Sequence, residues 1–67
     1  MKIGIIKEKI KSGEKYNLIL MDTFKHIYTY DVDINTFENT SVGEKIIAEE
    51  DVNILHYLGD NRMLRMY

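Results

Sequence analysis

The sequence predicts a mainly β domain, in which five or six short antiparallel strands curl into a small barrel. Two observations support this prediction. Apolar and polar residues alternate with a period of two over residues 24–34, and turn-forming residues separate several short apolar runs. The chain has 67 residues, so we expect residues 1–67 to form a single small β domain.

The clearest alternation runs from Phe24 to Ile34. Aromatic and β-branched residues dominate one parity, which comprises Phe24, His26, Tyr28, Tyr30, Val32 and Ile34. The other parity carries the polar residues Lys25, Thr29, Asp31 and Asp33. This pattern predicts a strand with one face in the core and the other in solvent.

Two further strands precede this one. The run from Tyr16 to Met21 has the length of a strand that is covered on both faces. Residues 12–14, Ser-Gly-Glu, predict a tight turn that leads back to a first strand near residues 3–10. Within that first strand the isoleucines change parity, which predicts a bulge near Ile5 and Ile6. The spacing of Ile3, Ile6 and Ile10 also suits a helix.

The second half of the chain leaves one segment open. Residues 35–41 predict a loop. For residues 42–51, a capping box formed by Ser41 and Glu44 would start a short helix. The glycine at position 43 and the β-branched pair at 46–47 instead favour a strand entered through a turn, followed by an acidic turn at 49–51. Residues 52–58 and 62–67 predict a hairpin around a turn at 59–61.

Short antiparallel strands of this kind leave two exposed sheet edges. At this size the usual way to cover the edges is a closed or nearly closed barrel of the SH3-like or OB-like kind. Such barrels carry many unrelated functions, so the function has to be inferred from individual residues.

The composition indicates the cellular compartment and the type of genome that encodes the protein. The chain has no cysteine, which excludes disulfides and thiolate zinc sites and fits a reducing cytoplasm. No apolar segment approaches the ~20 residues that a membrane span needs. Ten isoleucines and seven lysines beside one alanine and no proline are typical of an AT-rich genome. We therefore expect a cytoplasmic protein from a low-GC bacterium, its phage or a mobile element.

Catalytic and cofactor-binding patterns are missing from the sequence. Ser12 and Ser41 both fall in predicted turns, and no glycine-rich phosphate loop is present. The two histidines have the spacings Asp22-x-x-x-His26 and His56-x-x-x-Asp60. On a strand, residues four apart lie ~13 Å from each other, too far to share a metal ion. We expect a protein without catalytic residues, cofactor or metal.

The distribution of charge points to a protein partner. The formal net charge is −2, but residues 22–51 hold eight acidic residues against two lysines, a net charge of −6. The leading hypothesis is a small interaction module, such as a regulator or inhibitor, that docks an acidic face onto a basic partner protein. The proposed contact residues are Asp31, Asp33, Glu49, Glu50 and Asp51. Ordinary solvated surface charge would produce the same pattern.

Two alternatives stay open. Small barrels bind single-stranded nucleic acid by stacking bases on aromatic side chains beside cations. The candidate residues for that function are Lys7, Lys9, Lys11, Tyr57, Arg62, Arg65 and Tyr67. The three lysines share a parity, which also suits an edge strand protected against mispairing. A third possibility is a homo-oligomer whose exposed strand edges pair across a two-fold axis.

Overall fold

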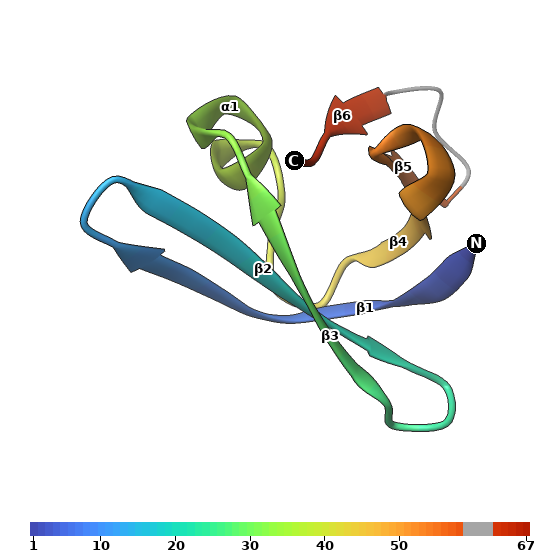
Figure 1. The fold of residues 1–67 in the computed structure, drawn as a ribbon. Coiled ribbons are helices and arrows are strands. Elements are labelled where there is room, and N and C mark those ends of the chain that lie inside the picture. The colour runs from blue at the N-terminus through green and yellow to red at the C-terminus, as the bar shows by residue number, and fades with distance from the viewer. Residues whose placement is uncertain (59–62) are drawn as a thin grey trace.

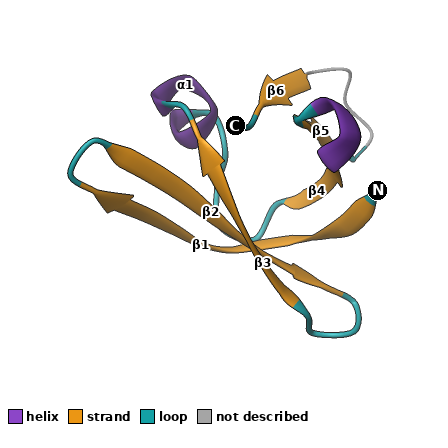
Figure 2. Cartoon of the chain, viewed as in Figure 1, coloured by secondary structure: helices purple, strands orange, loops and turns teal. Residues whose placement is uncertain are grey.

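The computed structural model describes residues 1–58 and 63–67. This part of the chain forms a six-stranded antiparallel sheet in the order β3-β2-β1-β4-β5-β6, drawn in Figures 1 and 2. The strands are β1 (Lys2–Ser12), β2 (Lys15–Asp22), β3 (Ile27–Val32), β4 (Lys45–Glu49), β5 (Ile54–Tyr57) and β6 (Met63–Arg65). A short helix α1 (Ile34–Glu38) and a 3-10 turn η1 (Glu50–Val52) complete the elements. The mainly β prediction is confirmed.

The sheet is not closed, so the predicted barrel is not confirmed. Among the described residues, an isolated bridge joins Val32 at the end of β3 to Met66, which directly follows β6. Beside this bridge the Tyr67 N–H donates to the Asp31 carbonyl at 2.8 Å, and the Met66 N–H donates to the Asn53 carbonyl at 2.9 Å. Residues 66–67 therefore lie between the end of β3 and the start of β5.

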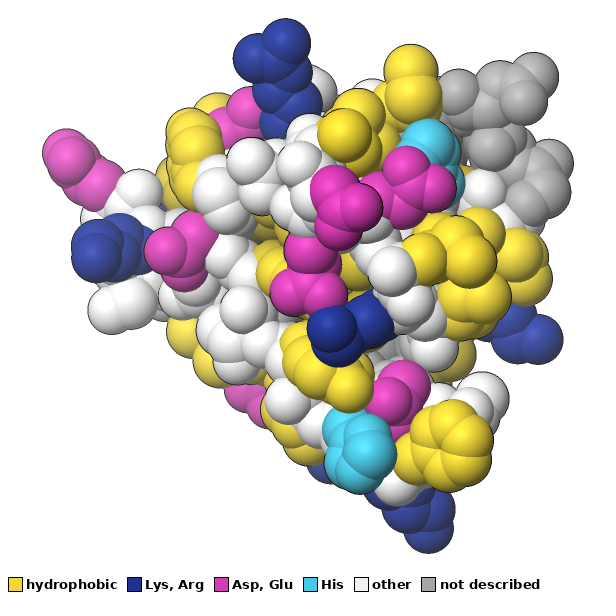
Figure 3. Space-filling view, turned by 45° about the vertical axis from the view of Figure 1, so that its right-hand side comes forward, with side chains coloured by type: hydrophobic (Ala, Val, Ile, Leu, Met, Phe, Trp, Pro, Cys, Tyr) yellow, Lys and Arg dark blue, Asp and Glu magenta, His cyan; other side chains and the backbone are white. Residues whose placement is uncertain are grey.

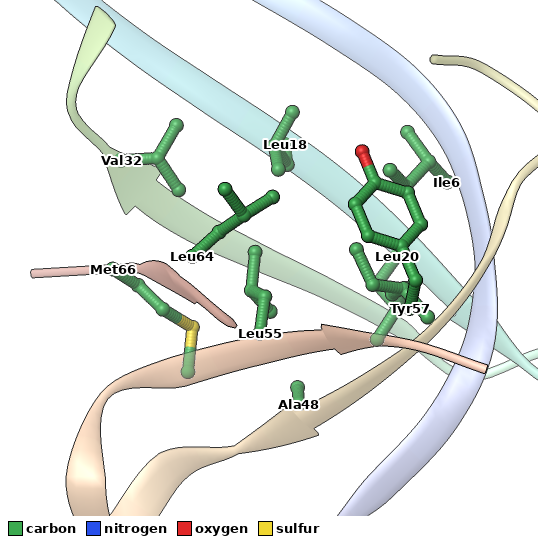
Figure 4. Close-up of a cluster of buried hydrophobic side chains, with 10 residues drawn as sticks. Ile6, Leu18, Leu20, Val32, Ala48, Leu55, Tyr57, Leu64 and Met66 are labelled. Carbon is green, nitrogen blue, oxygen red and sulfur yellow. The ribbon is translucent and has the colours of Figure 1, made fainter. Parts of the chain in front are cut away.

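The core is built from every second residue of the strands. The buried cluster contains Ile6, Leu18, Leu20, Val32, Ile46, Ala48, Leu55, Tyr57, Leu64 and Met66, most of which Figure 4 labels. Within β2, for example, Leu18 and Leu20 are buried while Ile19 between them is only half-buried. This is the period of two that a sheet with one core-facing side requires.

Strand β1 is a long, bulged strand rather than a helix. The bulge lies between Ile6 and Glu8, one residue later than the sequence predicted. Near its start, β1 passes very close to β2. A Cβ atom added to Gly4 would lie 2.3 Å from the Met21 carbonyl oxygen, so only glycine fits this approach.

The prediction of a loop over residues 35–41 is wrong at its start, where α1 forms. The Asp33 side chain caps this helix by accepting a hydrogen bond of 2.8 Å from the Thr36 N–H. The buried Thr36 hydroxyl in turn donates to the Arg65 carbonyl at 2.8 Å. A helix of five residues is too short to show a helical period in the sequence, and packing rather than propensity stabilises it.

For residues 42–51 the strand interpretation is confirmed. Gly43 has a φ of +92° in the turn that precedes β4. The Glu44 carboxylate accepts a hydrogen bond from the Ser41 N–H, as in a capping box, yet the chain continues as a strand. The expected acidic turn corresponds to η1, which ends at Asn53 in the left-handed region.

The predicted strand over residues 24–34 is shorter than expected. Residues 23–26 form a turn in which the Lys25 N–H donates to the Asp22 carbonyl at 3.0 Å and Lys25 has a φ of +67°. Phe24 is consequently 81% exposed instead of lying in the core. Ile34, also assigned to the core parity, is exposed at the start of α1. Tyr28 and Tyr30 do pack against the core as predicted.

The predicted hairpin of β1 and β2 forms. Residues Gly13 and Glu14 join β1 to β2, with Ser12 paired to Lys15 and a φ of +62° at Gly13. Strands β5 and β6 pair antiparallel, and the turn predicted between them at residues 59–61 lies outside the described residues. Neither helical segment in the described ranges has the length and hydropathy that a membrane span requires.

Candidate binding site

A pocket of about 440 Å³ opens where the β1–β2 turn, β3 and the last residue of the chain meet. It is lined by Glu14, Lys15, Tyr16, Asp31, Val32, Asp33, Ile34 and Tyr67. The volume lies within the range of small-molecule and side-chain binding pockets. The pocket contains two of the five residues predicted for the acidic face, Asp31 and Asp33.

The sheet register brings these residues together. Tyr16 at the start of β2 pairs with Val32 at the end of β3, so Tyr16 lies next to the segment that carries Asp31 and Asp33. The hydrogen bond from the Tyr67 N–H to Asp31 holds the end of the chain at the same place. The Tyr67 side chain remains 80% exposed, whereas the Tyr16 ring packs against Phe37 with centroids 5.0 Å apart. The pocket thus offers one fixed and one accessible tyrosine.

The pocket is negatively charged. The lining residues carry three carboxylates, from Glu14, Asp31 and Asp33, and one ammonium group, from Lys15, a formal net charge of −2. Asp31 accepts a hydrogen bond from the Asn17 side chain, and Asp33 caps α1. Each carboxylate has about four acceptor positions, so both can accept further hydrogen bonds. Carboxylates beside tyrosine rings are suited to a guanidinium or ammonium group.

The remaining acidic residues of the predicted face have different surroundings. Glu50 forms an ion pair with Lys2, and Glu49 approaches His56 with its carboxylate 3.5 Å from Nε2. Asp51 is exposed in η1. Figure 3 shows acidic side chains lying beside lysine and histidine side chains on one face of the molecule.

The Lys2–Glu50 pair covers two tyrosines of β3. The hydrogen bond to Glu50 raises the pKa of Lys2, whose Nζ lies 4.7 Å from the centre of the Tyr28 ring. Burial, together with the negative charge of Glu50, raises the pKa of Tyr30. Its hydroxyl is buried and makes no hydrogen bond to the described residues. Burial likewise raises the pKa of Tyr28, so both phenols are uncharged near neutral pH.

The distance predicted between Asp22 and His26 is wrong. His26 Nδ1 lies 3.3 Å from an Asp22 carboxylate oxygen because residues 23–26 turn back instead of extending. His26 was expected in the buried aromatic row, but its side chain is 68% exposed. No group of three or more histidine, cysteine or acidic residues within the described ranges could hold a metal ion. The second predicted spacing ends at Asp60, which lies outside those ranges.

The described lysines predicted for nucleic-acid binding do not all face the same side of the sheet. The bulge makes Lys7 an extra residue on the outer face, whereas Lys9 pairs with buried Leu18 and faces inward. Lys9 Nζ donates to the Thr40 carbonyl at 2.6 Å and lies 4.5 Å from the centre of the Phe37 ring. The predicted lysine stripe is therefore broken.

The other described members of that set have different surroundings. Tyr57 is only 7% exposed, and its hydroxyl donates to the Asn39 carbonyl, so its ring offers no stacking surface. Lys11 lies 5.7 Å from the centre of the Tyr16 ring, and Arg65 is exposed on β6. Tyr67 belongs to the acidic pocket. Arg62 lies outside the described residues.

Sequence reasoning missed Glu14 and Tyr16 as pocket residues. Their position follows from the two-residue turn at 13–14, which fixes the register of β1 on β2. Comparison with protein-family models, with curated proteins and with solved structures finds no match to this chain. The geometry of the pocket is therefore the observation from which a function is inferred.

Proposed function

We propose that this protein is a non-catalytic interaction module that binds a basic segment of a partner protein in the pocket between Tyr16 and Tyr67. The observation that carries the proposal is the combination of three carboxylates with two tyrosines around one opening. An arginine side chain would stack on the exposed Tyr67 ring and pair with Asp31 or Asp33. Blocking a basic surface in this way would suit a small regulator or inhibitor from a phage or mobile element.

The alternative of single-stranded nucleic-acid binding has less support. Such binding needs cations that neutralise phosphates beside the stacking aromatic rings. The exposed aromatic residue Tyr67 instead lies among carboxylates, which repel phosphate. Lys9 is already engaged with Thr40 and Phe37. The electrostatics of the pocket favour a cationic ligand.

Titration of the ¹⁵N-labelled protein with an acetylated tetra-arginine peptide tests the proposal. We expect amide shifts at Tyr16, Asp31 and Tyr67, and little response to an acetylated tetra-glutamate peptide. The variant Asp31→Asn/Asp33→Asn removes two charges and keeps a capping residue at position 33, because asparagine caps helices about as well as aspartate. Its affinity for the peptide should fall about tenfold or more.

Asp51→Asn is the matched control, since it removes an exposed charge away from the pocket. It should leave peptide binding within about twofold of wild type. If the control and the pocket variant lost the same affinity for the peptide, binding would be explained by general charge attraction, and a specific site would be refuted. Tight binding of a ten-nucleotide oligothymidine at low salt, weakening steeply as salt rises, would replace the proposal with nucleic-acid binding.

A further inference from the structure

The outer face of the sheet, opposite the core, carries a repeating arrangement of charged and apolar residues. In β4 the buried Ile46 and Ala48 alternate with the outward-facing residues Lys45, Ile47 and Glu49. This outward series reads positive, apolar, negative. The same three residues in reverse order on a second strand would match it residue for residue.

Apolar residues flank this series on the neighbouring strands. The central row across the sheet, defined by the register, is Ile3, Ile47, His56 and Met63. Ile3 and Met63 at its two ends are both exposed. Lys45 pairs with Ile5 of β1, and Glu49 pairs with Ile54 of β5. Each charge therefore lies next to an aliphatic side chain.

The Lys45 end of this face is hollowed. A groove of about 380 Å³ runs over it, with four aliphatic side chains and a polar rim that has one acidic residue and two lysines; its lining includes Ile3, Ile5, Met21, Leu58, Asp22, Lys25 and Lys45. Leu58 follows Tyr57, the partner of Ile46, and so lies beside Lys45 on the same face. The Glu49 end carries Ile54 and the exposed Met1, which precedes β1 beside it. One end thus offers a hollow whose lining residues carry a net charge of +1, and the other offers apolar side chains beside the Glu49 carboxylate.

We infer that two copies of the chain pack these outer faces together about a two-fold axis that runs along the central row. The β4 strands of the two copies are then antiparallel, with Ile47 on Ile47. Lys45 of each copy faces Glu49 of the other, and the aliphatic side chains around Glu49 enter the hollow around Lys45. Such a self-complementary surface is what a two-fold interface requires.

Charge selects this arrangement over the other two-fold packing of the same face. An axis parallel to β4 would place Lys45 on Lys45 and Glu49 on Glu49, and like charges in contact destabilise an interface. Face-to-face packing with sheets ~10 Å apart is also the ordinary arrangement of a β-sandwich. An average interface covers ~800 Å² per partner. That is about a sixth of the 4585 Å² surface of this molecule, so one sheet face can supply it.

Sedimentation equilibrium of charge-swapped variants tests the dimer. Lys45→Glu and Glu49→Lys each place like charges at two symmetry-related contacts, and each should weaken dimerisation about tenfold. The double variant Lys45→Glu/Glu49→Lys restores opposite charges across the axis and should return to within about threefold of wild type. Lys15→Glu makes the same charge change at the β1–β2 turn and should leave the dimer unchanged.

A cysteine experiment provides a second readout that does not depend on charge. The chain has no native cysteine, so Ile47→Cys introduces a single thiol at the axis. Mild oxidation should give a covalent dimer much faster than the same oxidation of Ser12→Cys, at the hairpin turn. If circular dichroism shows that a charge variant does not fold, the cross-linking rates of the two cysteine variants still test the dimer.

Three results would overturn the inference. They are a wild type that stays monomeric up to ~1 mM, a double variant as weak as the single ones, and equal cross-linking of both cysteine variants. The acidic pocket plays no part in this contact, so the dimer can be tested with the Asp31→Asn/Asp33→Asn background as well as with wild type.

Discussion

Replacement of Gly4 in β1 by alanine should destabilise the protein strongly, although it adds only one methyl group. The new Cβ would lie 2.3 Å from the Met21 carbonyl oxygen and 2.8 Å from its carbon, both backbone atoms that cannot rotate away. Strands β1 and β2 would have to separate by ~1 Å to reach an ordinary contact. Overpacking of this kind costs ~1–3 kcal/mol. Weakening one or two ladder hydrogen bonds beside it adds ~1 kcal/mol each.

The expected loss is therefore ~2–4 kcal/mol, a large part of the ~3–10 kcal/mol that a domain of this length has in total. Thermal unfolding followed by circular dichroism should show a Tm lower by at least ~10 °C. Gly13→Ala is the matched control because its φ is +62° and no atom lies within 4 Å of the added Cβ. That variant meets backbone strain alone and should lose only ~1 kcal/mol. Equal losses in the two variants would show that the close approach at Gly4 has no special cost.

Three further predictions concern the turns and the helix cap. Lys25→Gly should stabilise the protein by ~0.5–1 kcal/mol in urea unfolding, because it relieves a positive φ, whereas Asn53→Gly should change little since asparagine tolerates that region. Asp33→Ala should cost ~1 kcal/mol through loss of the cap, and Asp33→Asn should retain stability; equal stability of the two variants would exclude the capping role. Partial burial by itself would raise the pKa of Asp22, but hydrogen bonds from the His26 N–H, the Tyr28 hydroxyl and the Phe24 N–H lower it below the ordinary value of 3.8. A lowered folded-state pKa adds stability above pH ~4 that is lost on acidification, so urea unfolding at pH 2–7 should show a shallower acid-side decline for Asp22→Asn than for wild type.

The strands were predictable because each one repeats its pattern. Core residues appear at every second position, as at Leu18 and Leu20 in β2 and at Tyr28, Tyr30 and Val32 in β3, and the two-residue turn after Ser12 is visible in the residues themselves. The helix α1 was missed because its stabilising contacts are a local cap and a tertiary bond from Thr36 to the Arg65 carbonyl. Neither contact leaves a periodic trace in the sequence.

The candidate site was only half predictable for a related reason. Asp31 and Asp33 stand out as acidic residues that alternate with core positions. Their neighbours Glu14, Tyr16 and Tyr67 come from other parts of the chain and join them only through strand register and one bridge. The bulge in β1 also separates Lys7 from Lys9. The one extra residue reverses the side of the sheet to which the later residues of the strand point. Parity counted from the sequence cannot show such a reversal until the bulge is located.

The bridge between Val32 and Met66 also has a consequence for the order in which the molecule opens. Its two residues are thirty-four positions apart (66 − 32), so closing it requires most of the chain to be ordered first. Only a few backbone hydrogen bonds hold residues 66–67, whereas β2 is bonded on both sides, to β1 and to β3. In native-state hydrogen exchange, the Met66 and Tyr67 amides should exchange through local fraying, whereas the Leu18 and Leu20 amides should exchange only through global unfolding. Each such opening would break the hydrogen bond between the Tyr67 N–H and the Asp31 carbonyl, so the Tyr67 side of the pocket would open and close faster than β2 and β3 unfold.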